Sequence, residues 1–148
     1  MPTAAPVAIV IFGASGDLAQ RKLIPALYEM AREKLLPDKF ALVGFGRSEM
    51  SDDEYRKECR DAVTNFARTK PVDNGVADKL IKNASYCQGD YGSAEAHQKL
   101  AKKLADLDSS VGTAGNRLFY LSTPPNTFEP IITCLGEQHE KKANAYIR

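Results

Sequence analysis

The sequence lacks tryptophan and has only two histidines and three cysteines in 148 residues. The cysteines, Cys59, Cys87 and Cys134, stand far apart and form no C-x-x-C pair, so no zinc or dithiol motif is present and no metal site is predicted. Sparse thiols of this kind are typical of buried structural cysteines in a reducing compartment. His97 and His139 lie on polar faces of predicted helices, and we expect both to be surface side chains. The chain therefore offers no catalytic residue of its own.

An excess of either charge is also missing. Lys and Arg total 20 and Asp and Glu total 19, which gives a formal net charge of +1 and none of the basic surplus typical of nucleic-acid-binding proteins. The apolar run 7–12 near the N-terminus has no basic segment before it and is too short for a signal peptide or a membrane span. We therefore expect a cytoplasmic protein with neither a nucleic-acid nor a membrane partner.

Hydrophobic residues make up 43% of the chain and charged residues 26%, which fits one globular domain. Apolar runs at 7–12, 40–45, 85–90 and 117–122 predict strands, and amphipathic patterns between them predict helices. This alternation indicates a doubly wound, Rossmann-like α/β fold, with a mainly parallel sheet and helices on both faces.

Local signals place several boundaries. Pro25 predicts that a short helical turn ends and a helix restarts around it. Ser51, Ser93 and Asn126 are predicted N-caps, two of them with a glutamate three residues later. Residues 108–115 are predicted to be a loop. Residues 145–148 resemble the start of a fifth strand, so we expect the chain, a single domain over 1–148, to be a fragment of a longer protein.

The turn after the first strand carries the most specific pattern, Gly13-x-x-Gly16-x-x-Ala19, a variant of the dinucleotide-binding fingerprint. The first glycine permits the turn, the second allows a pyrophosphate to approach the backbone, and the small third residue lets the helix pack on the sheet. N–H groups at the helix start would then hold the phosphates, with the Ser15 hydroxyl as a further donor. We expect the Asp17 carboxylate to turn away and accept hydrogen bonds from local backbone N–H groups.

The end of the second predicted strand carries Arg47, and no acidic residue follows until Glu49. In dinucleotide-binding folds a carboxylate at this place selects NAD, whereas an arginine accommodates the 2′-phosphate of NADP. The sequence therefore favours NADP. There is neither a G-x-x-x-x-G-K-[ST] loop, which argues against a P-loop NTPase, nor a Tyr-x-x-x-Lys pair, which argues against an extended epimerase or reductase.

Three segments together resemble the N-terminal coenzyme domain of the glucose-6-phosphate dehydrogenase family. They are G-A-S-G-D-L-A at 13–19 with R-K-L-x-P at 21–25, G-F-G-R-S at 44–48, and N-R-L-F-Y-L-S-T-P-P at 116–125. The resemblance implies that the phosphates are cradled by Gly13, Ala14, Ser15, Gly16, Asp17, Leu18, Ala19 and Gln20. It also implies that Arg47 holds the 2′-phosphate, that Asp90 and Tyr91 contact the nucleotide further along the cleft, and that Pro124 lines the nicotinamide side.

The resemblance further implies an NADP-dependent oxidation of glucose 6-phosphate to 6-phosphogluconolactone, in the pentose phosphate pathway, by a homodimeric or homotetrameric enzyme. In the family the catalytic histidine and the substrate site lie on a later α+β domain that also forms the oligomer interface. We therefore expect residues 1–148 to bind the coenzyme but to have no dehydrogenase activity on their own. The alternative is a free-standing NADP(H)-binding sensor or regulatory module without catalysis.

Overall fold

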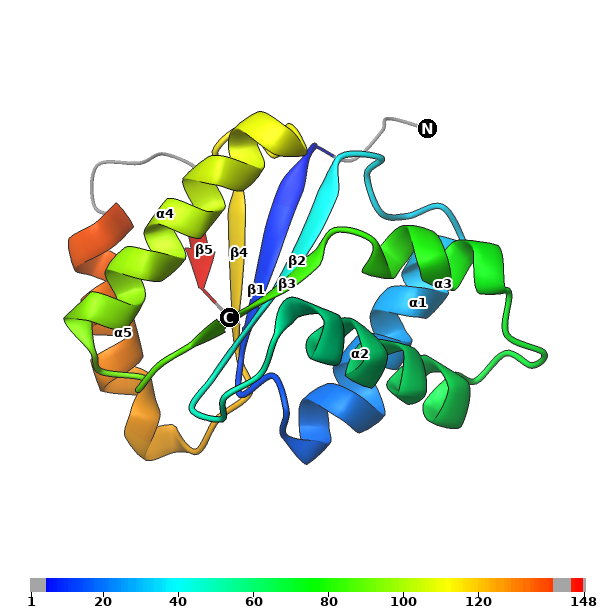
Figure 1. Cartoon of the computed structure of the whole chain (residues 1–148), viewed down its shortest axis with the longest axis horizontal. Coiled ribbons are helices and arrows are strands. Elements are labelled where there is room, and N and C mark those ends of the chain that lie inside the picture. Colours follow the sequence, from blue (N-terminus) through cyan, green and yellow to red (C-terminus); the bar gives the residue numbers. More distant parts are fainter. Residues whose placement is uncertain (1–4, 140–144, 148) are drawn as a thin grey trace.

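The protein is described by a computed structural model that covers residues 5–139 and 145–147, with side chains through Glu137. Five strands form one sheet in the order β3-β2-β1-β4-β5 within this described part (Figure 1). They are β1 (Val7–Phe12), β2 (Phe40–Gly46), β3 (Ala84–Gln88), β4 (Arg117–Leu121) and β5 (Ala145–Ile147). Every pairing is parallel. The predicted parallel sheet and the predicted fifth strand are confirmed.

Helices cover both faces of the sheet, as Figure 1 shows. One face carries the π-helical turn η1 (Ala19–Leu23), α1 (Ile24–Arg32), α2 (Asp52–Phe66) and α3 (Asn74–Ile81). The other carries α4 (Ala94–Ser110) and α5 (Phe128–His139). The central strand β1 serves both layers because its side chains alternate: Ile9 and Ile11 enter the first core, and Val10 and Phe12 enter the second. The fold is therefore the predicted doubly wound one.

Several local signals act as predicted. Ser51 and Glu54 form a reciprocal capping box at the start of α2, and the hydroxyl of Ser93 accepts from Ala96 N–H at 3.2 Å at the start of α4. Pro25 lies in the first turn of α1, directly after η1, although residues 17–32 are helical without a break across the two elements. All three cysteines are buried free thiols, as expected.

Two predicted boundaries are wrong. Asn126 is not an N-cap, because it lies inside a 3₁₀ turn, η2 (Pro125–Thr127), and α5 begins only at Phe128. The predicted loop 108–115 is in part helical, because α4 continues to Ser110 and places Asp108 in its last turn.

An ion pair with a buried arginine joins the last turn of α4 to the start of β4. The guanidinium of Arg117, which is 1% exposed, donates to both carboxylate oxygens of Asp108 at 2.7 Å. The same carboxylate accepts from the Thr113 hydroxyl at 2.6 Å and from Gly115 N–H at 2.9 Å. These donors hold the pKa of Asp108 well below its usual range, the Arg117 hydrogen bonds contributing most. The cluster fixes the end of α4 against the start of β4.

No helix in the described residues is long and apolar enough to cross a membrane. Nor do these residues contain a group of three or more His, Cys, Asp or Glu side chains arranged to hold a metal ion.

Candidate functional site

The segments singled out in the sequence meet at one edge of the sheet. Residues 13–20 follow β1, Arg47 follows β2, Asp90 and Tyr91 follow β3, and Pro124 follows β4. All these strands run parallel, so their carboxyl ends lie at the same edge. Ligands of open α/β sheets bind outside this edge, at the point where the strand order reverses. In this sheet the order reverses between β1 and β4.

The turn after β1 requires glycine at its first position. Gly13 has a φ of +83°, and a Cβ there would lie 2.3 Å from the backbone oxygen of Ser122. The turn therefore packs directly against the end of β4, and the N–H of Ser122 donates to the Phe12 oxygen at 2.9 Å. Loops that carry two different parts of the candidate site are thus held together by backbone contacts.

Some N–H groups of this turn are already used within the protein. The N–H groups of Gly13 and Ala14 both point to the carbonyl oxygen of Phe45, at 2.9 and 3.3 Å, and Gly16 N–H donates to the Gly13 oxygen at 3.0 Å. These bonds fix the turn to β2. They also remove three of the donors that the fingerprint alone would assign to a phosphate.

The remaining donors lie together at the start of the helical segment. The backbone N–H groups of Ser15, Asp17 and Leu18 have no acceptor within the described part of the chain, and all three residues are exposed. Ala19 is fully buried, as expected for the small residue that packs on the sheet, and the Gln20 side-chain amide donates to the Ala14 oxygen at 3.1 Å. Free N–H groups at a helical N-terminus favour an anionic group.

The carboxylate of Asp17 does not accept the local backbone hydrogen bonds that the sequence predicts. It accepts instead from Nε of Arg21 at 2.7 Å, one turn further on. The Arg21 guanidinium also lies over the ring of Phe66, 5.1 Å from its centroid. Both charged groups are exposed, so the pair contributes little to the stability of the fold. The Arg21 charge nevertheless offsets the negative charge of Asp17 beside the free N–H groups.

Arg47 is exposed at the end of β2 and has no carboxylate within ion-pair distance among the described residues. Its guanidinium lies over the ring of Tyr91, 5.8 Å from the centroid. Side chains from β3 hold its backbone: Gln88 Nε2 donates to the Arg47 oxygen at 3.2 Å, and the Tyr86 hydroxyl donates to the Ser48 oxygen at 2.8 Å. Sequence reasoning missed both β3 side chains, and no local signal marks them.

Tyr91 forms a platform between the core and Arg47. Its ring centroid lies 5.9 Å from that of Phe45 and 6.5 Å from that of Phe12. Burial raises the pKa of the Tyr91 phenol, and the nearby Arg47 charge opposes the rise. Asp90, its neighbour, is exposed, as is Pro124 across the strand ends.

His97 is buried, and the expectation of a surface side chain is wrong. It is 1% exposed, stacks on Phe12 at 5.8 Å between ring centroids, and donates from Nε2 to the Tyr91 oxygen at 2.8 Å. The spacing of His97, Leu100 and Leu104 on one helical face was the available signal. His97 thus anchors the segment that carries Tyr91. The side chain of His139 lies outside the described part.

Burial lowers the pKa of His97, with the Tyr91 hydrogen bond opposing, so the folded protein favours the neutral imidazole. Its contribution to stability is complete above the unfolded pKa of about 6.5 and is lost as pH falls through the lowered folded pKa. We expect urea unfolding between about pH 7.5 and about pH 5 to show this loss, and a His97→Gln variant to show a smaller one. An equal pH dependence in the variant would assign the effect to other groups.

Comparison with known proteins identifies the family. The family model described as "Glucose-6-phosphate dehydrogenase, NAD binding domain" matches residues 10–148. The chain belongs to this family. A nicotinamide dinucleotide is therefore its class of coenzyme, and the free N–H groups at 15–18 and the unpaired Arg47 fit such a ligand.

Curated relatives carry the same name. The glucose-6-phosphate 1-dehydrogenase of Chlamydia muridarum is 42% identical over 147 residues, which are 97% of this chain and 29% of that protein. That of Treponema pallidum is 38% identical and covers 99% of this chain and 28% of its own length. The chain thus spans less than a third of the relatives that it matches.

Solved structures agree. A glucose-6-phosphate dehydrogenase in complex with its substrate glucose-6-phosphate matches with a TM-score of 0.83 and 28% identity, over 100% of this chain and 30% of that one. The Mycobacterium avium glucose-6-phosphate 1-dehydrogenase matches with a TM-score of 0.79 and 27% identity, over 97% of this chain and 29% of that one. The family assignment and the Rossmann-like fold expected from the sequence are confirmed.

Proposed function

We propose that this chain binds NADP and is the coenzyme domain of an enzyme that oxidises glucose 6-phosphate to 6-phosphogluconolactone. The observation that carries the choice of NADP is Arg47, an exposed guanidinium at the end of β2 that has no carboxylate partner in the described residues. A guanidinium binds a phosphate through two parallel hydrogen bonds, whereas the 2′-hydroxyl of NAD offers it no charge.

The pyrophosphate would lie at the turn after β1. The free N–H groups of Ser15, Asp17 and Leu18 would donate to it, and the exposed Ser15 hydroxyl would add a fourth donor. The glycine at position 16 leaves this side of the turn without a side chain. The Tyr91 ring and the Arg47 guanidinium, which lies over that ring, would bound the adenosine end.

The nicotinamide would extend from the pyrophosphate toward the turn after β4. Pro124 is exposed there, and the contact between Gly13 and Ser122 keeps this turn beside the pyrophosphate site. Asp90 would contact the nucleotide from the end of β3. When bound, the coenzyme would accept hydride from the sugar, and this chain's role is to hold it.

The reaction itself needs groups that the described residues do not supply. His97, the histidine whose side chain is described, is buried in the core behind Tyr91 and cannot reach a substrate. We propose that proton removal and glucose 6-phosphate binding lie in the portion of the enzyme beyond this domain. A homodimer or homotetramer in the cytoplasm belongs to the same proposal. The names of the relatives favour it over a free-standing NADP(H) sensor.

Replacing Arg47 with alanine tests the coenzyme preference. We expect NADP affinity to fall by about 2 kcal/mol, roughly 30-fold, because a charge-assisted pair with the 2′-phosphate is lost, while NAD affinity changes little. Calorimetric titration of the chain with both coenzymes measures this. Arg68→Ala, which removes another exposed arginine, is the matched control and should leave both affinities unchanged. An equal loss for NADP and NAD in Arg47→Ala would contradict the assignment.

A further inference from the structure

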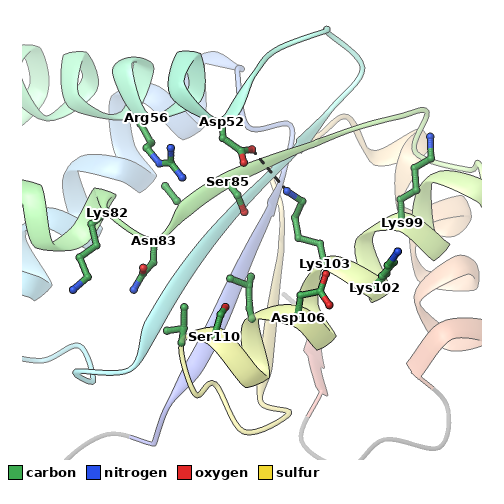
Figure 2. Close-up of a pocket in the computed structure, with 13 residues that line it drawn as sticks. Asp52, Arg56, Lys82, Asn83, Ser85, Lys99, Lys102, Lys103, Asp106 and Ser110 are labelled. Atoms are coloured by element: carbon green, nitrogen blue, oxygen red, sulfur yellow. Dashed lines mark ion pairs between the residues drawn. The ribbon is translucent and has the colours of Figure 1, made fainter.

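A hollow lies at the free edge of the sheet, away from the carboxyl ends of the strands (Figure 2). It has a volume of about 540 Å³ and opens beside β3, the last strand on that side. Its walls come from the start of α2, from residues 82–85 at the beginning of β3, and from α4. None of the residues assigned to the coenzyme lines it.

The lining of this β3-edge cavity is strongly cationic. Two carboxylates, Asp52 and Asp106, face five basic side chains, an excess of three positive charges, although the whole chain carries only +1. The basic residues are Arg56, Lys82, Lys99, Lys102 and Lys103. The positive charge is therefore a local feature, and it favours an anionic ligand.

The ion pairs within the cavity are loose. Lys103 Nζ lies 3.7 Å from Oδ1 of Asp52, and that oxygen already accepts from Tyr86 N–H at 2.8 Å. Lys82 and Lys102 have no carboxylate within ion-pair distance among the described residues. An anion that enters the cavity could therefore contact the ammonium groups of Lys82, Lys102 and Lys103, and no well-formed hydrogen bond of these lysines would have to break.

A buried polar side chain supplies the second observation. Ser85 lines the cavity, is only 8% exposed, and its hydroxyl has no hydrogen-bond partner in the described part of the chain. Arg56 Nη1 donates to Oδ1 of Asp53 at 2.8 Å, while Nε of the same guanidinium is buried and unpartnered in the described part of the chain. Figure 2 shows Ser85 between the α2 side chains Asp52 and Arg56 and the α4 side chain Lys103. Buried polar atoms usually pair with the protein, with water or with a ligand, so the Ser85 hydroxyl is a donor that a bound group can use.

We propose that the β3-edge cavity binds a small phosphomonoester, separate from the coenzyme. Lys103 holds the phosphate by charge, and the Ser85 hydroxyl donates to it. Arg56, which stays paired with Asp53, and the remaining lysines add positive potential around it. The volume falls in the range of about 300–1,000 Å³ usual for small-molecule pockets, so it has room for an organic group beside the phosphate. Addition of a peptide strand is disfavoured, because Asp52 already occupies the outward N–H of Tyr86.

Amide NMR spectra of the chain, titrated with inorganic phosphate and then with glycerol 2-phosphate, test this proposal. We expect saturable shifts at residues 83–86 and 102–106, with the tighter binding for the ester. Sodium chloride at matched ionic strength should not reproduce them. Coenzyme binding is read separately at residues 13–20, so either proposal can fail alone.

Two variants sharpen the test. Lys103→Gln and Ser85→Ala should each weaken phosphate binding, by about tenfold for the lysine, while Lys57→Gln, an exposed α2 lysine outside this cavity, should not. Ser85→Ala removes a hydroxyl that makes no hydrogen bond, so the fold should persist. Shifts that grow linearly, that chloride reproduces, that appear only at residues 13–20, or that both variants leave unchanged would overturn the proposal.

Discussion

Replacing Gly13 with alanine should lower the free energy of unfolding by about 2–4 kcal/mol and abolish measurable coenzyme binding. Two costs add. An L-residue at a φ of +83° is strained, and its Cβ would lie 2.3 Å from the Ser122 oxygen, which is backbone and cannot move aside. Relief of the clash must separate the β1 turn from β4, and this displaces the N–H groups at 15–18 from the proposed pyrophosphate site.

Urea denaturation and calorimetric titration with NADP measure the two effects. Gly136→Ala is the matched control, because a Cβ there meets nothing within 4 Å and the residue lies within α5. That substitution should stabilise the protein by up to about 1 kcal/mol through helix propensity. A Gly13→Ala protein with unchanged stability and affinity would show that the turn is not held as described.

Replacing Asp108 with asparagine should destabilise the protein by about 3–5 kcal/mol, because it leaves the guanidinium of Arg117 buried without its counter-charge. Arg117 is 1% exposed, and both of its terminal nitrogens donate to this one carboxylate. Asp106→Asn, an exposed carboxylate two residues earlier on α4, should change stability by less than about 0.5 kcal/mol.

The same pair predicts how stability depends on acid. The folded pKa of Asp108 is lowered, so its contribution is complete above the unfolded pKa of about 3.9 and is lost as pH falls below that value. Wild-type protein should therefore lose stability in this acid range, and Asp108→Asn should lose much less. Equal acid sensitivity in both proteins, or a small effect of Asp108→Asn at neutral pH, would contradict the role of the pair.

The sequence predicted what local chemistry determines. Hydrophobic runs predict the strands, Ser51 and Ser93 predict the starts of two helices, and the glycines at 13 and 16 predict the turn after β1. The order of strands and helices was enough for the fold class, because parallel strands need crossover helices and these have one hand.

Contacts between residues distant in the chain were not predictable in this way. Nothing in the residues beside Asp108 shows that Arg117 will bind it, so the polar stretch 108–115 predicts a loop although its first residues are helical. The family fingerprint does not show that the Phe45 oxygen uses the N–H groups of Gly13 and Ala14. The residues next to His97 in the sequence include polar ones that predict an exposed side chain, whereas its spacing to Leu100 places it on the buried face.

The most direct test of the account is amide NMR mapping of the chain with NADP and NAD side by side. Both coenzymes should shift the N–H signals of Ser15, Asp17 and Leu18, because both carry the pyrophosphate. Only NADP should strongly shift Arg47 and its neighbours, because only NADP carries the 2′-phosphate. Shifts centred elsewhere on the folded chain, or identical shifts at Arg47 with both coenzymes, would contradict the proposed site.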